Sequence, residues 1–261
     1  MAADVTSGEA LSADHPPRRA SPHRGRFLFV YGTLGAVLVL ALVGIVIYAG
    51  RSISPDPTWS AWKPQGGGLG AAKEIADHVG SGYRLQGGKQ LVVVIARVPS
   101  VTAKETIPIN FFSIRDPKGV RDALVPVNGS NSLTFSLCGL GQACSIATGK
   151  PSVARGVLVD REILELALYT FKYVAGVKNV VAFQPPVMGK PQYAVYLQKS
   201  DLSQELKVPL VRTLSPKVPL PSTIIPREQQ MIDSVLKSRI YKSSYAQSQQ
   251  GDLLLVLRPS A

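Results

Sequence analysis

Hydrophobic residues are distributed unevenly along the chain. Residues 27–49 form a run of 23 residues that contains no charged side chain. A helix rises about 1.5 Å per residue, so this run extends about 34 Å and is long enough to cross a hydrocarbon core of about 30 Å. Inside lipid a lone segment satisfies its backbone hydrogen bonds as a helix. The pattern therefore predicts a transmembrane helix over residues 27–49.

Two other interpretations of this run are weaker. A cleaved signal peptide has an apolar region of about 7–15 residues behind a short basic start. Here the run is longer, 26 residues precede it, and residues 47–49 make a poor cleavage site. A buried helix of a folded core rarely runs this long without a polar face. A single membrane span fits the pattern better than either.

Basic residues near the run predict its orientation. Four precede it closely and two follow within a similar distance: Arg18, Arg19, Arg24, Arg26, Arg51 and Lys63. This excess places the N-terminus in the cytoplasm. Residues 1–26, which lack apolar periodicity, are then a disordered cytoplasmic tail. We expect a single-pass protein of the cell membrane whose C-terminal part is extracytoplasmic.

A linker is predicted over residues 50–70, because this segment is first Pro-rich and then Gly-rich. It contains both tryptophans of the chain, Trp59 and Trp62. These side chains could touch the outer interface of the bilayer or anchor the linker on the folded domain. The prolines stiffen the segment, which favours the second alternative.

The remaining residues, 71–261, are enough for one folded domain. Their periodicity predicts helices over residues 71–79, 160–174 and 226–239, a helical turn over 201–206, and an extended crossing over 209–226. Strands are predicted over residues 90–98, 106–115, 132–137, 179–184, 193–198, 241–247 and 253–257. Strands in pairs between isolated helices are typical of an α+β fold. We therefore expect a mixed, mostly antiparallel sheet with two to three helices, following the single N-terminal transmembrane helix.

The strongest predicted helix of the domain covers residues 160–174. Asp160 is a natural N-cap, since its carboxylate can accept from the first backbone N–H groups. Glu162, Glu165, Tyr169 and Lys172 share one side of this helix. We interpret them as a solvated polar stripe, in preference to a general acid–base pair formed by the two glutamates.

The two cysteines, Cys138 and Cys144, lie in a glycine-containing loop after a predicted strand. Outside the cytoplasm such a pair can close a disulfide, and Gly139 and Gly141 allow a small ring to turn. The alternative is two free thiols. A redox-active Cys-x-x-Cys pair is absent from the sequence. We expect a structural disulfide.

An enzymatic alternative uses one of these cysteines. A cytoplasmic N-terminus, one span and one external domain match the topology of sortases, and His78, Cys144 and Arg155 occur in the order that such enzymes use. The strand motif around the catalytic cysteine of sortases is missing, and His78 lies on the polar side of an ordinary helix. A cysteine-dependent envelope enzyme of sortase-like topology is therefore the second hypothesis.

The sequence predicts a well-built domain without a catalytic constellation, which favours a binding function. The charge bears on the partner: it suits an anionic polymer or lipid headgroup, or it is simply a generally basic surface. The net charge is +12, and residues 50–261 carry 25 Lys and Arg against 14 Asp and Glu, so +11 belongs to that part. The basic residues are scattered, and nucleic acid is not an expected partner there. With three histidines and two cysteines, we predict neither a metal nor a cofactor. The first hypothesis is a non-enzymatic protein whose basic external domain binds or scaffolds another envelope component, with the lipid bilayer, a membrane or envelope protein, or an anionic envelope polymer as partners.

Overall fold

The structure, a computed structural model, describes Tyr31, Gly35 and residues 37–41, 58–102, 106–115, 124–147 and 152–260. The chain divides into two compact units, Met1–Asp56 and Pro57–Ala261. The described residues of the first unit have a helical backbone. Across the described residues, no helix combines the length and the hydropathy needed to cross a bilayer. The span expected over residues 27–49 falls largely outside the described residues.

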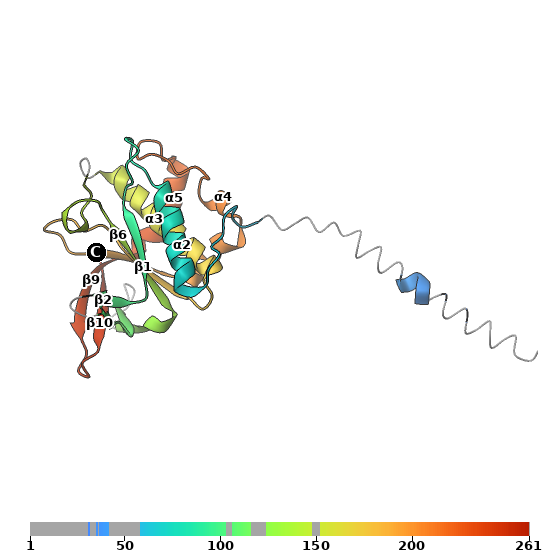
Figure 1. Cartoon of the computed structure of the whole chain (residues 1–261), viewed down its shortest axis with the longest axis horizontal. Coiled ribbons are helices and arrows are strands. Elements are labelled where there is room, and N and C mark those ends of the chain that lie inside the picture. Colours follow the sequence, from blue (N-terminus) through green and yellow to red (C-terminus); the bar gives the residue numbers. More distant parts are fainter. Residues whose placement is uncertain are drawn as a thin grey trace, which may run out of the picture. The chain divides into compact units, whose positions relative to one another are not determined.

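The second unit is built on an eight-stranded sheet with the strand order β1-β6-β7-β8-β9-β10-β4-β5 (Figure 1). Two neighbouring pairs, β6 with β7 and β10 with β4, are parallel, and the other five are antiparallel. A separate pair, β2 and β3, is antiparallel. The strands are β1 (Val93–Arg97), β2 (Ser100–Thr102), β3 (Thr106–Pro108), β4 (Phe111–Arg115), β5 (Leu124–Asn128), β6 (Ser132–Cys138), β7 (Asn179–Phe183), β8 (Tyr193–Gln198), β9 (Ile240–Gln247) and β10 (Leu253–Pro259). The expected α+β fold with a mixed, mostly antiparallel sheet is confirmed.

Helices cover one face of this sheet (Figure 1), and α3 packs against both α2 and α5. The α-helices are α2 (Gly68–Gly82), α3 (Val153–Tyr173), α4 (Leu210–Thr213) and α5 (Pro226–Leu236). Short 3-10 turns occur at Gly129–Asn131, Gln142–Cys144, Lys199–Leu202, Glu205–Lys207 and Lys237–Arg239. The three long helices are those that the periodicity predicts, while α4 adds one helical turn inside the segment expected to be an extended crossing.

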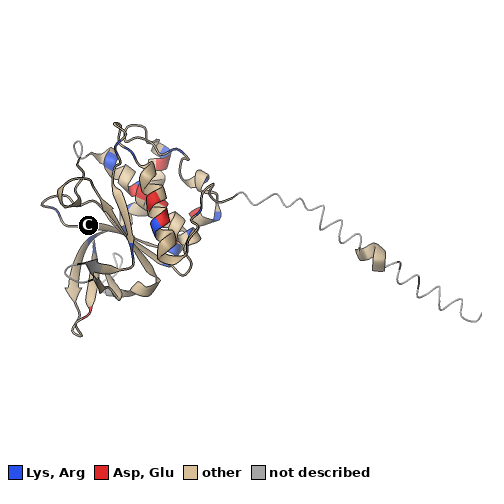
Figure 2. Cartoon of the chain, viewed as in Figure 1, with Lys and Arg blue, Asp and Glu red and all other residues tan. Residues whose placement is uncertain are grey.

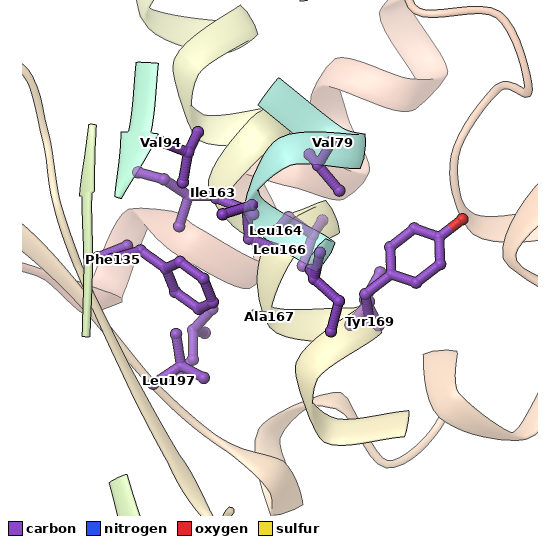
Figure 3. Packing of buried hydrophobic residues seen from close by; sticks show 14 of the residues in the cluster. Val79, Val94, Phe135, Ile163, Leu164, Leu166, Ala167, Tyr169 and Leu197 are labelled. Atoms are coloured by element: carbon purple, nitrogen blue, oxygen red, sulfur yellow. The ribbon is translucent and has the colours of Figure 1, made fainter. Parts of the chain in front are cut away.

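The main core lies between the helices and the sheet. Phe135 of β6 and Leu197 of β8 point from the strands toward Ile163 of α3 (Figure 3), and all three side chains are fully buried. The opposite face of the sheet carries a second buried cluster that includes Phe112 and Leu255. Its members come from strands of the sheet and from Ile109, and no described helix contributes to it.

The strand expected over residues 106–115 is in fact two. Pro108 cannot donate to a ladder, and β3 ends there; the N–H of the next residue, Ile109, donates to the Pro99 carbonyl beside β2. Strand β3 therefore pairs with β2, and only β4 joins the main sheet. The pattern also missed β5, which contains Pro126; this strand lies at the edge of the sheet, where proline is tolerated.

Helix α3 begins seven residues before the expected start. Its N-cap is Ser152, whose Oγ accepts the N–H of Arg155 at 3.3 Å. Asp160 is therefore not the N-cap; it lies inside the helix and accepts a hydrogen bond from Gln184. Gly156 and several β-branched residues in the first two turns weaken the helical pattern there, which explains the error.

The polar stripe expected to be solvated is mostly covered. Glu162 is 0% exposed and Tyr169 is 3% exposed. Helix α2 packs along α3, while Tyr169 contacts the aromatic rings of the preceding segment. Sequence periodicity shows that residues share one side of a helix but not whether another element covers that side.

Candidate functional site

The disulfide between Cys138 and Cys144 is present and closes a tight loop at the end of β6. The loop folds back closely on the residues that follow it: a Cβ added to Gly139 would lie 2.1 Å from the carbonyl oxygen of Ser145. Glycine is required at this position because no larger residue fits. The loop therefore determines where the next residues, Ser145 and Ile146, run.

The residues of the enzymatic alternative do not form a nucleophile–base pair. Both sulfurs are bonded to each other, so neither is available as a thiolate. His78 instead stacks on Trp62, with ring centroids 3.9 Å apart and planes 5° from parallel. Partial burial lowers the pKa of this histidine. Arg155 lies at the start of α3, where it lines a pocket.

That pocket has a volume of about 280 Å³ and is formed by three segments. They are the chain after the disulfide loop, the first two turns of α3, and the loop that follows β7. Since α3 connects the parallel strands β6 and β7, the pocket lies at their carboxyl ends, the position where many sheets with helical crossovers bind ligands. Its apolar wall consists of Ile146, Val159, Pro185, Pro186, Val187 and Met188.

The uncharged polar side chains of the wall are engaged within the protein. Ser145 donates its hydroxyl to a backbone carbonyl at 2.7 Å, and the Gln184 amide donates to Asp160 Oδ1 at 2.8 Å. The hydroxyl oxygen of Ser152 accepts the helix-capping hydrogen bond described above. The inside of the pocket is consequently more apolar than its residue composition suggests.

Asp160 is not part of the pocket lining, but it accepts the hydrogen bond that positions Gln184 in the wall. Burial raises the pKa of its carboxyl to about 6, although the hydrogen bond from Gln184 opposes the rise and the nearby Asp233 adds to it. Above that pH the carboxylate is ionised and is a stronger acceptor for the Gln184 amide. Asp160 therefore has a positioning role in place of the capping role expected from the sequence.

Apart from the pocket, a polar cluster around Arg161 is buried between the helices. The guanidinium of Arg161, 1% exposed, donates to Glu228 Oε1 at 2.8 Å, to Glu165 Oε2 at 3.1 Å, to the Tyr83 hydroxyl, and to the Ser215 carbonyl at 2.7 Å. These bonds join α3 to α5 and to Tyr83 at the end of α2. Figure 2 shows most acidic residues of this unit on its helices, not on its sheet. The cluster ties the helical layer together.

Glu162 lies next to this cluster in an unusual environment. Both carboxyl oxygens are buried and have no hydrogen-bond partner within the described part of the chain. Burial, reinforced by the like charge of Glu165, raises the pKa of Glu162 well above its ordinary value. Periodicity alone predicts that Glu162 is solvated. The apolar composition of the surrounding helix was the one sequence signal that Glu162 is buried.

The segment before α2 is anchored on the domain, the alternative that its stiffening prolines favoured. Trp59 is 8% exposed and meets Tyr169 and Tyr173 edge to face, at 5.4 and 5.7 Å between ring centroids. The carbonyl of Trp59 accepts the N–H of Leu210 at 2.8 Å, and Ser60 hydrogen-bonds the Tyr169 hydroxyl. The aromatic rings thus hold this segment against α3.

Comparison of the chain with protein-family models, curated proteins and solved structures finds no match. Within the described ranges, no group of three or more His, Cys, Asp or Glu side chains is arranged to hold a metal ion. The pocket at the start of α3 is therefore the feature of the described residues that bears most directly on function.

Proposed function

We propose that this chain is a single-pass membrane protein whose extracytoplasmic domain is a non-enzymatic binding module for another component of the cell envelope. The observation that carries the binding function is the pocket beside the disulfide loop. Its wall is apolar, its uncharged polar side chains are already hydrogen-bonded, and its one ionisable side chain is Arg155. Such a surface favours binding over proton transfer.

The membrane location rests on the sequence. The uncharged run over residues 27–49 and the four arginines that precede it support a span with a cytoplasmic N-terminus. A disulfide between Cys138 and Cys144 is consistent with an oxidising compartment for the folded domain. Protease added to intact cells should therefore digest the C-terminal domain, and protection of that domain would reverse the orientation.

Site-specific crosslinking tests the binding function. Met188 is 92% exposed and lines the pocket, so a photo-crosslinking amino acid at this position should capture a partner in intact membranes. Gly70, an exposed residue of α2 outside the pocket, provides the matched control position. Equal capture at both positions would argue against the pocket as the contact. Turnover of a substrate that a single substitution abolishes would argue against a non-enzymatic role.

A further inference from the structure

We infer that the pocket holds an acyl chain of an anionic membrane lipid. This inference rests on the proposed function, because it needs the domain to be tethered outside the membrane. Nine residues separate the end of the proposed span from Trp59, and a chain of that length extends at most about 30 Å. Trp59 packs on Tyr169 and Tyr173 in the last turns of α3, while the pocket lies at the start of that helix. The tether limits how far the domain moves from the bilayer, and the pocket reaches the bilayer when the domain turns on this tether. Lipid is consequently the most concentrated apolar ligand available to the pocket.

The size and the lining of the pocket suit a hydrocarbon chain. A dry apolar cavity of about 150 Å³ is enough to bind benzene, so a pocket nearly twice that size has room for roughly ten carbon atoms. The wall formed by Val159, Ile146 and the loop after β7 supplies the apolar contact surface. Each methylene removed from water there favours binding.

A peptide is a poorer occupant, because the wall offers it few hydrogen-bond donors. Pro185 and Pro186 have no N–H group, and the N–H of Gln184 is bonded to the Tyr193 carbonyl. On α3 the N–H groups of Arg155 and Gly156 are both bonded to Ser152. A buried peptide backbone would leave carbonyl groups unpaired along this wall, whereas an acyl chain has none to satisfy.

The mouth of the pocket supports an anionic headgroup and contact with a bilayer surface. Arg155 is the one charged residue in the lining, and Lys190 is exposed two residues beyond Met188. Met188 in the lining and Val153 at the start of α3 are 92% and 80% exposed, so apolar as well as basic side chains face the solvent here. Exposed apolar side chains beside basic ones are typical of surfaces that bind anionic membranes.

Gly156 permits a direct test. This residue lines the pocket, lies in the second turn of α3, and has nothing within 4 Å of the position of an added Cβ. Gly156→Phe therefore adds a bulky side chain to the pocket wall without a backbone clash. Gly70→Phe is the matched control, because Gly70 is also an exposed helical glycine with open space around it and lies outside the pocket.

The full chain is reconstituted into phosphatidylcholine vesicles that contain a minor fraction of phosphatidylglycerol with a photoactivatable group in its acyl chain. After irradiation, mass spectrometry identifies the labelled peptides. We expect labelling of the segment 184–188 and of the first turns of α3, at least tenfold lower in Gly156→Phe and unchanged in Gly70→Phe. Arg155→Gln should lower labelling by phosphatidylglycerol severalfold. The remaining labelling should approach the level obtained when the photoactivatable acyl chain is carried by phosphatidylcholine.

Three results would overturn the inference. Labelling that is equal in Gly156→Phe and the wild type would show that the chain does not enter the pocket. Equal labelling by the two phospholipids would remove the preference for an anionic headgroup. Labelling by a photoactivatable free fatty acid but not by phosphatidylglycerol would assign the pocket to a different source of acyl chain. If the lipid arms fail while crosslinking from Met188 captures an envelope protein, the binding function stands and only its lipid chemistry is wrong.

Discussion

Replacing Arg161 by methionine should strongly destabilise the folded domain. The guanidinium is buried and donates to Glu165 on its own helix and to groups on three other segments, which are Tyr83, Ser215 and Glu228. Methionine fills similar space but cannot donate. Glu165 would keep its hydrogen bond from Tyr83, and Glu228 would keep those from Ser215. Both carboxyl groups, however, would remain in the helical layer without the guanidinium.

The magnitude follows from the loss of one partner of a buried ion pair. Such a loss costs about 3–5 kcal/mol, because the remaining charge stays desolvated and uncompensated. The total free energy of unfolding of a domain is about 5–15 kcal/mol, so Arg161→Met should remove roughly a fifth or more of it. Arg161→Lys keeps the charge but loses the forked geometry, and should lie between Arg161→Met and the wild type.

Urea unfolding of the full chain in nanodiscs, followed by tryptophan fluorescence, measures this effect. Both tryptophans of the chain, Trp59 and Trp62, lie in the folded unit and report its unfolding directly. Arg212→Met is the control: Arg212 is exposed on α4, and its substitution should change the free energy by less than about 0.5 kcal/mol. A loss below about 1 kcal/mol for Arg161→Met would refute a structural role for the cluster.

The pH dependence separates lost charge pairing from lost packing. In the wild type, burial raises the pKa of Glu228, but hydrogen bonds from Ser215 and Arg161 outweigh it and leave the pKa lowered. Glu228 therefore adds stability above its unfolded pKa, and this contribution disappears as the pH falls through the folded pKa. Without Arg161 the pKa of Glu228 rises, so protonation relieves its buried charge, and the deficit of Arg161→Met should be smaller at pH 5 than at pH 8. An equal deficit at both pH values would indicate that packing accounts for the loss.

Four further outcomes are expected. Glu162→Gln should be more stable than the wild type at pH 8 and about equally stable at pH 4. The reason is that burial raises the native pKa of Glu162, so the folded state retains a proton that the unfolded chain releases. Urea unfolding at both pH values checks this. The wild type should lose stability as the pH rises toward 6, because the native pKa of Asp160 is raised to about 6 and the unfolded chain releases this proton first; Asp160→Asn should not show this loss. Thermal melts from pH 4 to 7 check this, and melting temperatures that change with pH in the same way for both proteins would contradict it. Replacing both Cys138 and Cys144 by alanine should cost about 2 kcal/mol, since the ring is small, and the wild type under reducing conditions should lose the same amount. Gly156→Ala should add up to about 1 kcal/mol because the added methyl meets open space within a helix, and a lower melting temperature by circular dichroism would show that the site is strained.

Local pattern was sufficient for most of the secondary structure. Strand β8 and the final hairpin agree closely with their predicted ranges, because alternating apolar residues and turn-forming residues act over a few positions. The disulfide was also predictable, since Cys138 and Cys144 are close in sequence and the glycines between them permit a small ring. The start of α3 was missed because its first turns contain Gly156 and β-branched residues that weaken the helical pattern.

The candidate site was much less predictable. Its wall combines Ile146, Val159 and Pro186, which come from three segments that only the fold brings together. Arg155 and His78 were considered from the sequence as residues of a cysteine-dependent enzyme. In the structure Arg155 lines the pocket and His78 stacks on Trp62. The sequence around each of these residues does not indicate which distant residues it contacts in the fold.

By itself, the sequence determined the uncharged run over residues 27–49, the excess of basic charge after it, the α+β class and the Cys138–Cys144 pair. These properties depend on composition and on contacts between near neighbours in the chain. Only the tertiary structure decided that Glu162 is buried, that Arg161 joins three segments, and that a pocket opens beside α3. Burial depends on which elements cover a surface, and that is set by packing between distant parts of the chain.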